Sequence, residues 1–163
     1  EEKLPSIVFW LMGSFATSNW EKFLFFFVPF LLCSSILLGL SWRLNLLSLD
    51  EKEAKALGVR VTLLRWLVIF LSGSLVACQV AISGSIGWVG LIIPHLSRML
   101  VGANHQRLLP CTMLVGATYM LLVDNVARSL SDAEIPISIL TALIGAPLFG
   151  VLEYKLKRGG MNE

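Results

Sequence analysis

Long apolar runs separated by short polar segments dominate this chain. Residues 23–40 are almost wholly apolar, and at about 1.5 Å per residue they are long enough to cross about 30 Å of hydrocarbon. Further apolar stretches follow at residues 63–82, 86–101, 108–127 and 136–154. The pattern predicts an all-α, polytopic membrane bundle of about five transmembrane helices that occupies residues 1–163 as one unit.

Two segments interrupt this pattern. Residues 4–15 are too short to cross a bilayer and contain aromatic side chains suited to its interface, so we expect a short helix at the outer surface. Residues 41–60 carry seven charged side chains. Each charge at the centre of a bilayer costs on the order of 3 kcal/mol, so this segment is expected to be an aqueous loop.

Within that loop, residues 50–58 have the pattern of a short helix with both ends marked. Asp50 is expected to cap the first turn, Glu53 to return a hydrogen bond to the cap residue, and Gly58 to take the left-handed conformation that ends the helix. The spacing alone fits both a docking helix for another protein and a solvated connector.

Lysine and arginine are distributed unevenly between the two ends of the predicted spans. Ten of the 13 basic residues fall on one side when the loops are assigned alternately. Cytoplasmic loops carry the excess of such residues, so we expect the C-terminus and residues 50–58 to be cytoplasmic.

Composition agrees with a membrane protein and excludes several other classes. Hydrophobic residues make up 56% of the chain and charged residues 15%, against roughly a quarter charged in soluble domains. The net charge of +2 comes without a basic stripe, which argues against nucleic-acid binding. Cys33, Cys78 and Cys111 stand alone in apolar surroundings and are expected to be small core residues.

No cofactor or metal site is expected. His95 and His105 lack partners at metal-ligand spacing, so both are expected to be structural. No glycine-rich loop that ends in lysine and serine or threonine is present, so the chain is not expected to bind ATP.

Residues 83–98 combine closely spaced glycines with a proline inside an apolar region. Irregular backbone at membrane depth is tolerated only where protein or a water-lined cavity satisfies its polar groups. The motif residues Gly84, Gly87, Gly90 and Pro94 are therefore typical of a packed transporter bundle.

Asp124 lies in an apolar span four residues before Arg128. Helical spacing favours an ion pair that neutralises the acid, and a proton relay is the alternative function for an intramembrane carboxylate.

Four blocks of sequence resemble the permease subunits of ABC importers for iron chelates, haem and cobalamin. They are residues 53–59, residues 84–95 with Arg98, residues 124–128, and residues 134–136 with 145–149. The resemblance covers essentially the whole chain. Members of that family have ten spans, so the chain resembles the C-terminal half of one subunit and is expected to belong to a longer protein.

The resemblance implies roles for individual residues. Residues 50–58 would be the cytoplasmic coupling helix that contacts an ATP-hydrolysing subunit, and Arg128 would pair with a carboxylate of a periplasmic binding protein. Residues 4–15 would form a short periplasmic helix near the gate, and Ser138 and Thr141 would line the pathway. The coupling residues would be Asp50, Glu53, Ala54, Ala56, Leu57 and Gly58, and the structural motif would comprise Gly84, Gly87, Gly90, Pro94, His95, Arg98, Pro136, Gly145 and Pro147.

Some positions depart from that family's usual residues. Asp50 and Ser138 stand where glycine is usual, Ser85 replaces proline or alanine, and Trp88 replaces phenylalanine. The hydroxyl of Ser138 near the presumed pathway leaves the substrate class open.

The resulting hypothesis is a permease subunit in a bacterial inner membrane that performs no chemistry itself. Its expected partners are a second copy of the subunit, two cytoplasmic ATP-binding subunits, a periplasmic binding protein and the lipid bilayer. The cargo would be an iron-siderophore, haem or cobalamin, with a molybdate-type oxyanion also possible. The alternatives are a secondary transporter driven by an ion gradient through Asp124, and a truncated assembly partner that does not transport.

Overall fold

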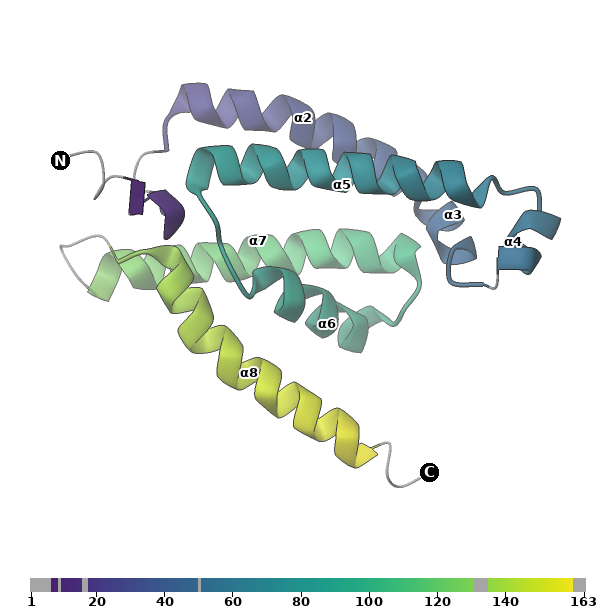
Figure 1. The fold of residues 1–163 in the computed structure, drawn as a ribbon. Helices are drawn as coiled ribbons and strands as arrows, with labels where there is room; N and C mark the ends of the chain where they lie inside the picture. The colour runs from purple at the N-terminus through teal and green to yellow at the C-terminus, as the bar shows by residue number, and fades with distance from the viewer. Residues whose placement is uncertain (1–6, 9, 16–17, 50, 131–134, 160–163) are drawn as a thin grey trace.

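A computed structural model describes residues 7–8, 10–15, 18–49, 51–130 and 135–159. Seven helices account for most of these described residues (Figure 1). They are α2 (Trp20–Gly39), α3 (Ser41–Leu46), α4 (Glu51–Ala56), α5 (Val61–Ser83), α6 (Val89–Val101), α7 (His105–Leu130) and α8 (Ile137–Gly159). The all-α, polytopic fold class predicted from the apolar runs is confirmed.

Three helices are long and apolar enough to cross a membrane: α2, α5 and α7, the last over His105–Ser129. They correspond to the first, second and fourth predicted spans. The other two contain shorter apolar helices, Val89–Val101 and Ile137–Val151. Five complete crossings therefore remain a prediction, which depends on α6 and α8.

The long helices form two layers. In Figure 1, α2 lies beside α5, and below them α7 lies beside α6, while α8 runs obliquely away from the α7–α8 junction. The short helices α3 and α4 lie together at the end of the bundle where α2 ends and α5 begins.

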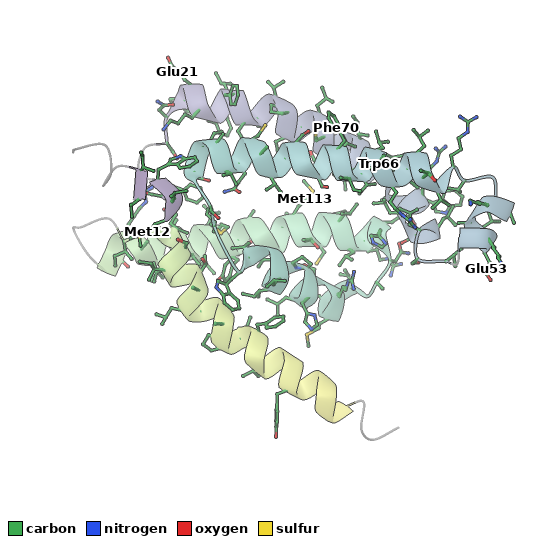
Figure 2. All side chains as sticks on the ribbon, viewed as in Figure 1. Met12, Glu21, Glu53, Trp66, Phe70 and Met113 are labelled. Carbon is green, nitrogen blue, oxygen red and sulfur yellow. The ribbon has the colours of Figure 1, made fainter. Side chains whose placement is uncertain are left out.

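Large apolar side chains face outward along the spans. Trp66 and Phe70 on α5 are 66% and 72% exposed (Figure 2). A continuous apolar exterior of this kind would be unstable in water and suits a hydrocarbon environment. One buried cluster joins α7 to α8 and consists of Val123, Ala127, Ile137 and Leu140.

The third predicted span, residues 86–101, begins later than expected. The helix α6 starts at Val89, because Trp88 has a positive φ of 67° that a right-handed helix cannot include. The Val89 N–H instead donates to the Gly87 carbonyl at 2.8 Å in a tight turn. Residues 84–88 are thus an irregular connection between α5 and α6.

Candidate functional site

The short helix α4 stands between two spans and has a well-formed C-terminal stop. The Val59 N–H donates to the Ala54 carbonyl at 3.2 Å, and the Gly58 N–H donates to the Lys55 carbonyl at 3.0 Å. This pair of bonds is a Schellman motif, which requires a left-handed residue before its last donor. Gly58 meets that requirement with a φ of +78°, so the predicted helix stop is confirmed.

The predicted coupling residues do not all face the same way. Glu53, Ala56, Leu57 and Gly58 are exposed, whereas Ala54 is only 1% exposed. The small side chain of Ala54 therefore serves packing beneath the helix and offers no surface to another protein in this arrangement. Asp50, the predicted N-cap, lies outside the described residues, so the expected capping interaction with Glu53 stays a prediction.

A polar cluster ties the loop region to the next pair of spans. The Asn45 side chain on α3 accepts a hydrogen bond from the backbone N–H of His105, the first residue of α7, at 2.8 Å. Its amide nitrogen donates to Asn104 at 2.9 Å. The Asn45 oxygen also lies 2.8 Å from His105 Nδ1, and because an amide oxygen only accepts, this contact requires a proton on Nδ1. The structural role expected of His105 agrees with this position.

The opposite end of the bundle is held together by main-chain contacts of residues 10–14. The Ser14 N–H donates to the Ser83 carbonyl at 3.0 Å, and the Gly13 carbonyl accepts from the Ile137 N–H at 3.0 Å. The Ser138 hydroxyl donates to the Met12 carbonyl. One short segment therefore connects the end of α5 to the start of α8. Among the described residues of the predicted outer helix 4–15, residues 7–8 and 10–11 are helical.

Gly84 is the closest point of this junction. A Cβ atom there would overlap the Trp10 carbonyl oxygen, and Gly84 also has a φ of +72°. The side chain of Gln79 donates to the Ser83 hydroxyl at 2.8 Å and to the Gly84 carbonyl at 3.1 Å. These bonds satisfy the polar groups that the end of α5 leaves without helical partners.

Close packing also involves Gly145 on α8. An added Cβ would lie 2.6 Å from Cδ1 of Ile92 and 2.9 Å from the Cβ of Trp88. In contrast, a Cβ on Gly87 or Gly90 would meet nothing within 4 Å among the described residues. Among the predicted motif glycines, Gly84 and Gly145 therefore allow a close approach of neighbouring atoms in this fold, whereas Gly87 and Gly90 do not.

The remaining motif residues occupy positions along α6 and α8. Pro94 and Pro147 lie inside these helices, and the Pro136 carbonyl accepts the Ile139 N–H at the start of α8. His95 is half-buried, and Arg98 is exposed in the last turn of α6, where its carbonyl accepts the Gly102 N–H. No group of three metal-ligating side chains occurs in the part of the chain that the structure describes.

Arg128 and Asp124 form an ion pair on α7. The Arg128 Nε lies 2.9 Å from an Asp124 carboxylate oxygen, as the helical spacing predicts. The Arg128 side chain remains 62% exposed, so it is accessible at the end of α7 while it neutralises the acid. The pairing is confirmed, and contact with a binding protein stays a prediction.

The two predicted pathway hydroxyls take part in local hydrogen bonds. Thr141 is fully buried and donates to the Ser138 carbonyl at 3.1 Å, while Ser138 bonds to Met12. Their role in lining a pathway stays a prediction. Of the three free cysteines, Cys33 is buried as expected, and Cys78 and Cys111 are half-buried.

Comparison with known protein families accounts for this arrangement. The profile of the FecCD transport family matches residues 1–155. The chain belongs to the FecCD transport family. The resemblance inferred from the four sequence blocks is therefore confirmed.

Individual FecCD relatives match almost the whole chain. It is 95% identical over 163 residues to the molybdate import system permease protein MolB of Haemophilus influenzae, covering 100% of the chain and 48% of MolB. It is 40% identical over 148 residues to a probable iron chelatin transport system permease protein of Helicobacter pylori, covering 91% of the chain and 45% of that protein. It is 39% identical over 147 residues to the vitamin B12 import system permease protein BtuC of Klebsiella pneumoniae, covering 90% and 44%.

A solved structure agrees with the fold. It is described as an inward-facing conformation of a candidate metal-chelate type ABC transporter, and it matches with a TM-score of 0.93 at 95% identity over 95% of this chain and 50% of that chain. The chain spans about half the length of the curated relatives it matches.

Several residues of this FecCD fold were not identified from the sequence. Asn45, Gln79 and Asn104 make the polar contacts at the two ends of the bundle, and Trp88 holds the positive φ before α6. A polar amide at the edge of an apolar run is a signal for Asn45 and Gln79. The partners of Asn45 lie about 60 residues away, and Gln79 bonds to Ser83 in its own helix and to Gly84 in the irregular turn. Nothing local to Trp88 marks its conformation.

Proposed function

We propose that the chain forms half of the permease subunit of a binding-protein-dependent ABC importer. The observation that carries this proposal is α4, a short helix set between two spans and closed by Gly58, where the predicted coupling residues Glu53, Ala56, Leu57 and Gly58 are exposed. Such a helix is a compact contact surface for a cytoplasmic ATP-binding subunit. ATP hydrolysis would occur on that partner, so this chain would not be an enzyme.

The cargo proposed here is molybdate. The 95% identity to MolB extends over the full chain, whereas the iron chelatin and vitamin B12 permeases are about 40% identical. This difference favours the oxyanion over the metal chelates suggested by the sequence blocks. The full assembly would include a second permease copy and a periplasmic binding protein that contacts the exposed Arg128.

A physical route for the transport cycle follows from the contacts. Movement of α4 would reach α5 directly through Val59 and Arg60, and α3 would pass it to α7 through the Asn45 contact with His105. At the other end, residues 10–14 connect α5 to α8. A shift of one helix pair would therefore be transmitted to the other end of the bundle as rigid-body motion.

The experiment is purification of the tagged full-length gene product from its native membrane, followed by identification of the proteins that remain bound. Uptake of radioactive molybdate and of an iron chelate would be measured in the same strain and in a deletion strain. Recovery of an ATPase subunit together with loss of molybdate uptake on deletion is expected. Recovery of no ATPase from membranes that preserve a control ABC importer would contradict the proposal.

The ion-driven alternative is less favoured because Asp124 is engaged by Arg128. If uptake stopped with uncouplers but continued after ATP depletion, the ion-driven transporter would be favoured instead.

A further inference from the structure

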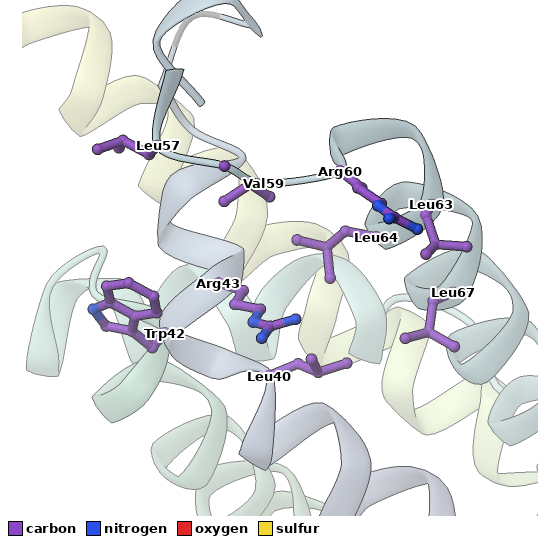
Figure 3. Close-up of a pocket in the computed structure, with 10 residues that line it drawn as sticks. Leu40, Trp42, Arg43, Leu57, Val59, Arg60, Leu63, Leu64 and Leu67 are labelled. Carbon is purple, nitrogen blue, oxygen red and sulfur yellow. The ribbon is translucent and has the colours of Figure 1, made fainter. Parts of the chain in front are cut away.

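A groove lies beside α4, at the end of the bundle where α2 ends and α5 begins. Its volume is about 330 Å³, within the roughly 300–1,000 Å³ range of small-ligand sites. It is lined by residues from the end of α2, from α3, from the α4–α5 connection and from the first two turns of α5 (Figure 3). Because α2 and α5 are membrane-length helices, this position corresponds to the boundary between hydrocarbon and water.

The polar end of the groove is strongly cationic. Arg43 and Arg60 both line it, and in the view of Figure 3 Leu64 lies between their guanidinium groups. Both residues are exposed, and neither side chain makes an ion pair or hydrogen bond with the residues that the structure describes. Two guanidinium groups at one groove are suited to bind a phosphate group.

The start of α5 adds to this positive potential. No side chain caps the first amides of α5, and its N-cap residue is Arg60 itself. The N-terminus of a helix carries unpaired N–H groups and the positive end of the helix dipole. Gly58 and Val59 line the groove at the same point, so its backbone is not screened by bulky polar side chains.

The rest of the groove is apolar and open. Leu40, Leu63 and Leu67 line it, and Leu63 is 61% exposed. Trp42, which is 59% exposed, lies at the groove as aromatic side chains do at a membrane interface. A ligand that matches this surface combines an anionic head with an apolar tail.

We infer that this groove binds one anionic phospholipid of the surrounding leaflet, with the phosphate at the end that Arg43 and Arg60 line and an acyl chain along Leu63 and Leu67. Basic pockets between transmembrane helices are known to accept anionic head groups. The bound lipid would fill the space beside α4 and support the position of the connection that contains Gly58. The inference rests on the proposed membrane insertion and is independent of the transported substrate.

Native mass spectrometry of the full-length gene product tests this site. The delipidated protein would be titrated with phosphatidylglycerol and, separately, with phosphatidylcholine. Each basic residue near an anionic head group strengthens binding about fivefold, so the double variant Arg43→Gln/Arg60→Gln should bind phosphatidylglycerol about 25-fold more weakly. Arg107→Gln, an exposed arginine outside the groove, is the matched control and should bind as the wild type does.

The double variant Arg43→Lys/Arg60→Lys guards against a folding defect, because it keeps both charges and should keep the preference for phosphatidylglycerol. Equal binding of the two lipids by the wild type would overturn the inference. Undiminished phosphatidylglycerol binding by the glutamine variant would also overturn it. So would displacement of phosphatidylglycerol by millimolar inorganic phosphate, which would indicate a simple anion site. If the wild-type protein kept this lipid preference but did not take up molybdate, only the proposed function would be contradicted.

Discussion

The Asn45 side chain accepts the backbone N–H of His105 at 2.8 Å, so a residue of α3 caps the first turn of α7 from 60 positions away. Helix N-termini are usually capped by the residue that precedes them, and Asn104 performs that role here by accepting the Gln106 N–H. The α7 N-terminus is therefore capped twice, once locally by Asn104 and once by Asn45 of α3. This arrangement makes the first turn of α7 sensitive to the position of α3.

Replacement of Asn45 should weaken this connection. We expect Asn45→Ala to lower the free energy of unfolding by about 1 kcal/mol, the usual cost of losing a cap. Asn45→Asp should lose less, since it keeps an acceptor for the His105 N–H. Thermal unfolding of the full-length product in detergent measures both. Asn125→Ala is the control, because the exposed Asn125 side chain donates to the Leu121 carbonyl within α7. A larger loss for Asn125→Ala would contradict the assignment.

Gly145→Ala should destabilise the contact between α6 and α8. The new methyl group would lie 2.6 Å from Cδ1 of Ile92, so side chains or helices must shift, at a cost of typically about 1–3 kcal/mol. Gly150→Ala on the same helix meets nothing within 4 Å among the described residues and should cost nothing. The difference in melting temperature between the two variants checks the prediction, and equal values would show that α8 does not pack on α6 through Gly145.

Substitution of Gly84 should be more damaging than substitution of Gly87. Alanine at Gly84 would overlap the Trp10 carbonyl and would also have to adopt a φ of +72°, whereas alanine at Gly87 has open space among the described residues. We expect Gly84→Ala to abolish uptake or stable membrane insertion and Gly87→Ala to leave both near the wild-type level. Membrane abundance by immunoblot and uptake of the transported substrate would be compared for the pair. Equal tolerance of alanine at both positions would show that residues 10–14 do not pack at this turn.

The effect of a substitution at Gly58 should depend on how readily the new residue adopts a positive φ, and not on the volume of its side chain. Its φ is +78°, and a Cβ added there would meet no atom of the described residues within 4 Å, so Gly58→Ala adds only the left-handed strain of about 1–2 kcal/mol. Asparagine adopts this conformation more readily, so Gly58→Asn should restore most of the function. ATP hydrolysis stimulated by the binding protein would be measured in the reconstituted importer. A worse result for asparagine than for alanine would mean that side-chain volume at the partner surface matters more.

The variant Asp124→Asn distinguishes between two roles of Asp124, as a partner in an ion pair or as a proton relay. The pair is exposed on the arginine side, so its loss should cost at most about 1 kcal/mol and leave most of the uptake intact. A relay residue would instead be indispensable. Uptake is measured for Asp124→Asn and for the double variant Asp124→Asn/Arg128→Gln. Complete loss of uptake by a well-inserted Asp124→Asn protein would favour the ion-coupled alternative.

Features set by neighbours in the chain could be predicted from the sequence alone. Apolar runs of sufficient length determine the helices α2, α5 and α7, because the bilayer thickness fixes the number of residues needed. The stop at Gly58 and the pair of Asp124 with Arg128 follow from spacings of a few residues, within which side chain and backbone must meet. The family itself was inferred from the resemblance of four sequence blocks, which the FecCD profile over residues 1–155 confirms.

Other features exist only because distant segments meet. The glycines at 84 and 87 are alike in the sequence, yet only Gly84 faces the Trp10 carbonyl, since residues 10–14 fold back across the end of α5. Likewise, Asn45 finds His105, and Arg43 and Arg60 share one groove, because α3 turns back against the bundle. The length of the apolar runs determines which segments can cross the membrane. Close contacts between helices depend on the shapes of their surfaces, which meet only when the helices pack.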